Sequence, residues 1–157
     1  MKRIICLFFV FCLSLCLISC TGQNAENHYY QNGYLKCNDI QRYTDVEQFY
    51  MSSSMLSSIR ANIQNKEYGN RILSAIGNVK AEKIDWNDEL IDNDKLQQVF
   101  VNGIQINFSE FALFIGTDGT VVLRDSDSAY ITESFAVDYN TMKNMCKEIA
   151  TKSDQLF

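Results

Sequence analysis

Hydrophobic residues recur along the chain either at helical intervals or in strand-like alternation. Residues 44–77 show the helical intervals. Apolar side chains recur at helical intervals over residues 44–66, and Thr44 and Glu47 have the spacing of a capping box, so we expect a helix there. A shorter helix capped by Asn70 is expected next. It should end at Gly77, because glycine tolerates the left-handed conformation found at helix ends.

From Val79 onward, apolar and polar residues alternate, which is the pattern of strands. Residues 79–86 predict one strand. Residues 96–108 predict a hairpin turning at Asn102-Gly103, the pair favoured by a two-residue type I′ turn. A second hairpin is expected for 111–115 against 120–124 around Thr117-Asp118-Gly119, and a further strand for 129–137.

The chain closes with a second helical pattern. Residues 141–152 carry an apolar stripe, and Asn140 or Asp138 is placed to cap it. The order of helix, short helix, antiparallel strands and helix predicts an α+β fold. In this fold a β-meander of about five strands is packed by an N-terminal helix or helix pair and by the C-terminal helix.

Length and charge narrow the class of protein. A chain of 157 residues suits a single domain with a sizeable core. The formal net charge is −5, and without Lys2 and Arg3 the remaining 12 basic and 19 acidic side chains give −7. Such a surface disfavours nucleic acid, because phosphate binding needs clustered Lys and Arg, but it suits a basic partner.

The N-terminus has the pattern of an export signal. Lys2 and Arg3 precede an uncharged apolar run over residues 4–18, which is typical of a signal-peptide core and short for a membrane-spanning helix. Directly after it, Leu17-Ile18-Ser19-Cys20 resembles the lipobox of bacterial lipoprotein precursors. An uncleaved anchor helix and an ordinary secretory leader are the alternatives.

The resemblance implies that Cys20 is lipidated and that the chain is cleaved between Ser19 and Cys20, leaving a stable anchor in the lipid bilayer of the cell envelope. It divides the chain into a signal peptide (1–19), a lipidated cysteine with its tether (20–36) and a globular domain (37–157). Because Thr21 follows the cysteine, the family pattern favours the periplasmic side of the outer membrane in a bacterium with two membranes. Tyr29, Tyr30 and Tyr34 interrupt the tether, and we expect them to fold back on the domain rather than dip into the membrane interface.

The six cysteines reduce to two in the mature domain, Cys37 and Cys146, since three lie in the leader and one accepts lipid. In an oxidising compartment these two most simply form a disulfide. It would close a loop of about 110 residues and contribute about 4–5 kcal/mol on the chain-entropy argument. Two separate buried thiols are the competing interpretation.

The sequence offers little catalytic chemistry. The single histidine, His28, lies in the expected tether, which argues against Ser-His-Asp and Cys-His arrangements. Neither a zinc pattern nor a phosphate-binding glycine loop is present, and the acidic stretches depart from the EF-hand pattern, so we expect no enzyme activity, cofactor or metal. The third-ranked hypothesis remains a hydrolase that uses two carboxylates.

We expect instead a non-catalytic module that binds a protein partner, and one concrete version is an immunity protein that blocks a toxin delivered by a competing cell. The alternative is an accessory or pilot lipoprotein of an envelope assembly or secretion machine. Partner-binding residues are expected where an aromatic side chain adjoins carboxylates: Trp86, Asp85, Asp88, Glu89 and Asp92.

Substitution of the lipobox cysteine tests the anchor. Cys20→Ser removes the thiol that accepts lipid, so we expect the protein to leave the membrane fraction while the wild type stays there, as measured by fractionation and immunoblotting. The matched control is Cys16→Ser, which alters a leader cysteine outside the lipobox. A Cys20→Ser protein that is cleaved and still pellets with membranes would contradict the assignment.

Overall fold

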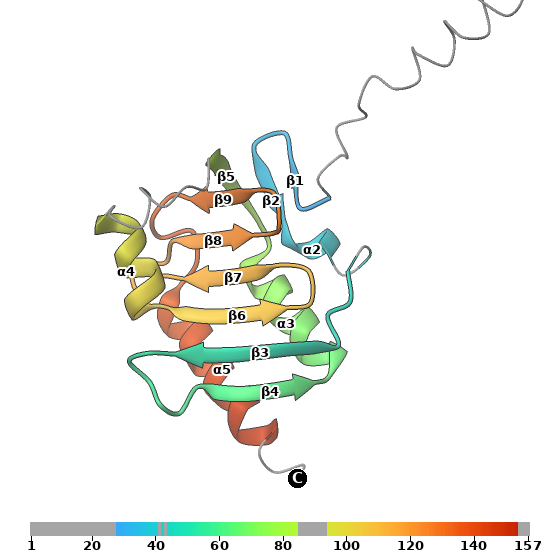
Figure 1. Ribbon diagram of the computed structural model, residues 1–157, viewed down its shortest axis with the longest axis vertical. Coiled ribbons are helices and arrows are strands. Elements are labelled where there is room, and N and C mark those ends of the chain that lie inside the picture. Colours follow the sequence, from blue (N-terminus) through green and yellow to red (C-terminus); the bar gives the residue numbers. More distant parts are fainter. Residues whose placement is uncertain (1–27, 41, 43, 85–93, 154–157) are drawn as a thin grey trace, which may run out of the picture.

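The computed structural model describes residues 28–40, 42, 44–84 and 94–153, and it has an α+β fold (Figure 1). The elements are β1 (Tyr30–Gln31), β2 (Tyr34–Lys36), α2 (Cys37–Ile40), β3 (Gln48–Ser53), β4 (Arg60–Gln64), α3 (Lys66–Ile76), β5 (Asn78–Ile84), α4 (Asp94–Asn102), β6 (Ile104–Phe108), β7 (Ala112–Ile115), β8 (Val121–Arg124), β9 (Ala129–Thr132) and α5 (Tyr139–Ser153). The strands form one nine-stranded sheet in the order β1-β2-β5-β9-β8-β7-β6-β3-β4. All neighbouring strands are antiparallel.

The two faces of this sheet are covered differently. Helices α3 and α5 lie behind the sheet in Figure 1, whereas α4 lies in front, over one end of its middle strands. Side chains alternate along each strand, and one set from β3, β4, β6, β7 and β8 joins α3 and α5 in the main core. Its sheet members include Ile63, Ile104, Ile106, Leu113, Ile115, Val121 and Leu123. The smaller core under α4 consists of Leu96, Val99 and Val122, with Phe100, Phe114 and Ile131 packed around them.

The closing helix is confirmed. Asp138 caps α5, since its carboxylate accepts hydrogen bonds from the backbone amide of Asn140 and the hydroxyl of Thr141. The expected stripe is buried, with Met142, Cys146, Ile149 and Ala150 all facing the core. The β7–β8 hairpin around Thr117-Asp118-Gly119 is also present, while β9 ends at Thr132, earlier than expected.

The helix expected over 44–66 is wrong, because this segment forms the β3–β4 hairpin. Phe49 and Met51 on β3 and Ala61 and Ile63 on β4 are buried, while the residues between them face outward. The expected capping box is absent as well, since the Thr44 hydroxyl donates to the carbonyl of Ile40. Long-range pairing with β6 thus outweighs the local helical spacing.

The first half of the expected 96–108 hairpin is also wrong, because residues 94–102 form α4. Asn102-Gly103 therefore joins a helix to β6 instead of turning a hairpin. A Cβ at Gly103 would lie 2.2 Å from the carbonyl oxygen of Val99 and 2.5 Å from that of Ile115, so the tight helix-to-strand junction needs glycine.

The short helix exists but begins earlier than expected. Its cap is Asn65, whose side chain accepts a hydrogen bond from the Glu67 amide, and Asn70 lies inside α3. The helix ends at Gly77, which has a φ of 69°, as the sequence predicts. The strand expected at 79–86 is confirmed as β5 over its described part, residues 78–84.

The expected tether is too long, because residues 30–36 form the β1–β2 hairpin at one edge of the sheet. Its turn is Asn32-Gly33, and both residues have positive φ, 53° and 81°. Tyr30 stacks on Tyr130 at a centroid distance of 4.7 Å, and Tyr29 lies 5.3 Å from Phe111. The expectation that these tyrosines fold back on the domain is therefore confirmed for Tyr29 and Tyr30, whereas Tyr34 lies in β2 with a side chain that is 44% exposed.

The predicted disulfide is not formed in the structure, where Cys37 and Cys146 are both free thiols. Cys37 begins α2 and Cys146 lies in the middle of α5, and each side chain is fully buried in the apolar core. Burial raises the pKa of each thiol to about 12, because the core disfavours the charged thiolate. The two cysteines therefore act as small apolar core residues.

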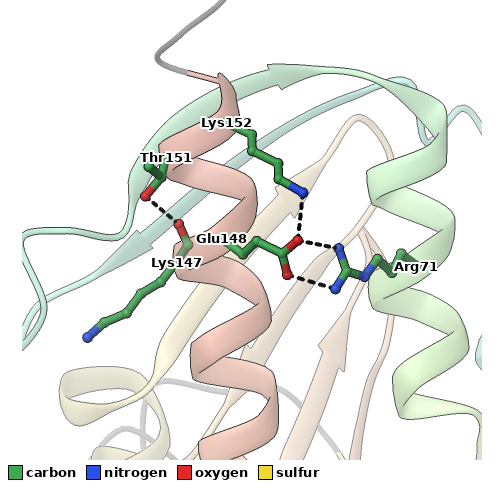
Figure 2. A network of polar contacts seen from close by, with 5 residues as sticks. All are labelled: Arg71, Lys147, Glu148, Thr151 and Lys152. Atoms are coloured by element: carbon green, nitrogen blue, oxygen red, sulfur yellow. Dashed lines mark hydrogen bonds and ion pairs between the residues drawn. The ribbon is translucent and has the colours of Figure 1, made fainter.

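Helices α3 and α5 are joined on their solvent side by an ion-pair network (Figure 2). The two terminal nitrogens of the Arg71 guanidinium donate to the Glu148 carboxylate, at 2.8 and 3.3 Å, and the Lys152 ammonium donates to the same carboxylate at 2.7 Å. Hydrogen bonds from Arg71 and Lys152 lower the pKa of Glu148 to about 2.

The network should make a pH-dependent contribution to stability. Because the folded-state pKa of Glu148 is lowered from 4.5 to about 2, the contribution is complete above pH 4.5 and is lost as the pH falls towards 2. We expect Glu148→Gln to lower the urea midpoint slightly at neutral pH, since the pairs are exposed, and the deficit should shrink through that acid range. Glu133→Gln is the control, since Glu133 makes one longer ion pair, 3.5 Å from Lys80. An unchanged deficit at about pH 2.5 would contradict the role of Glu148.

Candidate protein-binding site

The residues that the sequence places at a partner site, Trp86, Asp85, Asp88, Glu89 and Asp92, lie outside the described residues. The expected lipidation site Cys20 also lies outside them. Within the described ranges, no helix is long and apolar enough to span a membrane. The same residues contain no cluster of three or more His, Cys, Asp or Glu side chains that is arranged to hold a metal ion.

The described surface has one prominent apolar residue, Phe135. Its side chain is 85% exposed, the largest value among the large hydrophobic residues that the structure describes. Its backbone has a φ of 63°, a conformation that a bulky L-residue rarely adopts. Left-handed backbone at a non-glycine residue costs on the order of 1–3 kcal/mol and persists only where its surroundings impose it.

The surroundings that impose this conformation are the β7–β8 turn. The amide of Phe135 donates to the carbonyl of Asp118 at 2.8 Å, and the amide of Val137 donates to the carbonyl of Gly119 at 3.2 Å. Two backbone hydrogen bonds therefore fix the loop between β9 and α5 on either side of the exposed ring.

Gly119 makes this close approach possible. A Cβ at this position would lie 2.2 Å from the carbonyl oxygen of Val137 and 3.1 Å from the Cα of Phe135. Gly119 also has a φ of 80°, so both the available space and the backbone angle require glycine.

Asp118 ties the turn to the loop through its side chain. Its carboxylate accepts hydrogen bonds from the Thr120 amide and hydroxyl, at 3.0 and 2.9 Å, and from the Ser134 hydroxyl at 2.8 Å. Burial raises the pKa of this carboxyl, but the hydrogen bonds outweigh burial and leave the pKa below its ordinary value. Asp118 is therefore ionised at neutral pH.

A hollow of about 360 Å³ lies between the turn, the loop and the start of α5. Phe135, Val137 and Tyr139 contribute its apolar lining, and Asp118 and Asp138 contribute carboxylates. The hydrogen bond from the Thr141 hydroxyl lowers the pKa of Asp138, so this second carboxylate is ionised as well. The Lys143 ammonium lies 5.7 Å from the centre of the Tyr139 ring, at one side of this surface.

The carboxylates that line this hollow have structural roles. The residues lining the hollow include no histidine, lysine or cysteine, and the oxygens of Asp118 and Asp138 are already engaged in holding the loop and the helix. What remains available is an exposed aromatic side chain on a backbone held by hydrogen bonds, beside two negative charges. Buried aromatic anchors with polar surroundings are the typical centre of a protein interface.

The exposed position of Phe135 is not predicted by the sequence, because the residue falls within the strand expected over 129–137. The one local sign that the strand ends earlier is the polar pair Glu133-Ser134, which directly precedes Phe135 and breaks the alternation of apolar and polar residues. The neighbouring turn at Thr117-Asp118-Gly119 was predicted, but its contact with the β9–α5 loop depends on tertiary structure.

Comparison with known proteins adds no family assignment: no protein-family model, curated protein or solved structure matches the chain.

The backbone at Phe135 can be tested by substitution. Phe135→Gly removes the cost of the positive φ and loses an almost fully exposed ring, so we expect the free energy of unfolding to rise by about 1 kcal/mol. Urea denaturation followed by circular dichroism measures the change. Phe135→Val is the control, since a β-branched residue keeps the strain, and it should not stabilise the fold. A Phe135→Gly protein less stable than the wild type would show that the ring contributes to packing.

Proposed function

We propose that this chain is a lipid-anchored protein of the bacterial cell envelope that acts by binding a protein partner, with Phe135 as its anchor. The observation that carries the proposal is the conformation of Phe135, an exposed ring held at an unfavourable backbone angle by two hydrogen bonds and a glycine. Strained residues that the fold itself enforces are found preferentially at functional sites.

The partner should combine an apolar pocket with positive charge. Phe135 would enter the pocket, and the ionised Asp118 and Asp138 would face Lys or Arg side chains around it. The net charge of −7 on the part after the leader would speed association with a basic partner at low ionic strength.

An immunity protein is the concrete form that we favour. A chain held at the envelope by Cys20 would meet a delivered toxin where it arrives, and an anchor whose backbone is already fixed would bind it with little backbone reorganisation. Two features support this form: the lipobox Leu17-Ile18-Ser19-Cys20, and the small acidic domain with an exposed aromatic anchor.

Site-specific photocrosslinking tests the interface. A photoreactive phenylalanine analogue at position 135 of the full-length protein, irradiated in cells that carry the lipidated form, should yield one dominant adduct. The matched position is Met55, which is 66% exposed in the β3–β4 turn, several strands away from β9. The same analogue there should not give this adduct.

The identity and charge of the partner decide the outcome. A basic protein crosslinked at 135 and absent at 55 supports the proposal, and Phe135→Gly should weaken its affinity by tenfold or more. A crosslinked toxin would support the immunity form, and a component of an assembly machine would replace that form with the accessory role. Equal adducts at both positions, or none at 135 when the partner is present, would refute Phe135 as the anchor.

A further inference from the structure

A second surface, on the open face of the sheet, has the opposite electrostatic character. The outward positions of β3 and β4 are Gln48, Tyr50, Ser52, Arg60, Asn62 and Gln64. The outward positions of β6 are Gln105 and Asn107. None of these positions is acidic, although acidic side chains outnumber basic ones by 19 to 14 in the whole chain.

The described helices leave this part of the sheet uncovered. Figure 1 shows α3 and α5 on the far side and α4 over one end of the middle strands. The apolar residues of α4 pack on Phe114, Val122 and Ile131, which belong to β7, β8 and β9. The outward side chains of β3 and β4 therefore remain exposed or half-buried.

A hollow of about 250 Å³ lies where the end of α4 meets this face. Its walls are fixed by two contacts: Gly103 brings α4 against β7, and the Ser54 hydroxyl donates to the carbonyl of Val101. The lining side chains are Tyr50, Ser52, Ser54, Arg60, Phe100 and Gln105. The hollow thus combines a cation, hydroxyls, an amide and two aromatic rings.

The guanidinium of Arg60, the cation of this hollow, is available to a ligand. Arg60 lies opposite Ser52 in the β3–β4 register, and Ser52 in turn lies opposite Gln105 on β6. Arg60 forms no ion pair or hydrogen bond through its side chain with the described part of the protein. Beside it, Tyr50 is 41% exposed and presents a ring to the same face.

We propose that this hollow binds a carboxylate-bearing sugar, such as a uronic acid unit of a glycan. The Arg60 guanidinium would bind the carboxylate in two parallel hydrogen bonds, for which its planar shape is suited. Ser52 and Gln105 would bind hydroxyl groups as both donors and acceptors, and Tyr50 and Phe100 would cover the apolar C–H face of the ring.

The composition of the hollow favours an acidic sugar over a simple anion. A single exposed arginine gives little affinity by itself, because water and salt screen an isolated charge at a surface. Inorganic phosphate could accept hydrogen bonds from Arg60, Ser52 and Gln105 but would leave the aromatic rings without contacts. A neutral sugar would leave the one cation unused. An acidic sugar is the class that uses all four kinds of group.

Calorimetric titration of the purified full-length protein in mild detergent tests the proposal. The probe is tetragalacturonate, with maltotetraose as the uncharged sugar and inorganic phosphate as the sugar-free anion. We expect saturable binding of tetragalacturonate only. Arg60→Gln should weaken that binding by tenfold or more, because it removes a charge-assisted contact, and Gln105→Ala should weaken it by a smaller factor.

Arg42→Gln is the matched control, because Arg42 is an exposed arginine that pairs with Asp39 beside α2, away from the hollow. It should leave binding unchanged. Equal binding of phosphate would reduce the site to a general anion site, and equal binding of maltotetraose would exclude the role of Arg60. Absence of saturable binding by tetragalacturonate would overturn the proposal. None of these outcomes bears on Phe135, so the two sites are tested separately.

Discussion

The alternation of side chains across the middle strands is the constraint on which the rest of the structure depends. The residues of β6, β7 and β8 that point backward are large apolar groups, aliphatic except for Phe108, and together these groups form a surface that must be kept from water. Burial of this surface is what holds α3 and α5 in place. A shift of one residue in the register would turn the whole set to the other face, so the pairing of these strands is strongly determined.

The same alternation leaves the front of the sheet with two kinds of surface. On β7, β8 and β9 the outward residues include Phe114, Val122 and Ile131, and α4 covers them. On β3 and β4 the outward residues are polar, so a covering helix would bury unpaired amides and a guanidinium at considerable cost. The outward residues of the strands therefore determine which part of the front face α4 covers. The hollow at the end of α4 lies on the boundary between the covered apolar part and the uncovered polar part.

The sequence predicts those parts of the fold whose signals are local. Helix α5 is predicted from its cap, Asp138, and from the apolar stripe through Met142 and Cys146. The β7–β8 turn is predicted from Asp118-Gly119. Both signals are local, because capping and turn formation depend on a few neighbouring residues. Phe49, Ile59 and Ile63 fit a helical spacing as well as an alternating one. The choice between helix and strand there is made by β6, which no local pattern shows.

The same distinction applies to the candidate site. Gly119 is visible in the sequence as a turn residue, but its second role, admitting the Val137 carbonyl, exists only once the β9–α5 loop lies against it. The positive φ of Phe135 cannot be predicted from the residue type, since aromatic residues normally avoid this conformation. Sites created by the contact of two loops are for this reason the part of the structure that is hardest to derive from the chain alone.

The β1–β2 hairpin gives the domain a mechanical property. If lipid on Cys20 holds the chain, any pull between membrane and partner enters the fold at the first described residues and reaches β1 first. This strand is joined to β2 by two residue pairs, and β2 to β5 by three. Leu35 of β2 is fully buried in the main core, so β1 can separate without disturbing that core whereas β2 cannot. Release of residues 28–33 would lengthen the connection to the membrane by roughly 20 Å. The stacking of Tyr30 on Tyr130 and the hydrogen bond from the Tyr30 hydroxyl to the Ala81 carbonyl oppose this release, so β1 would act as an extensible segment in a protein tethered at one end.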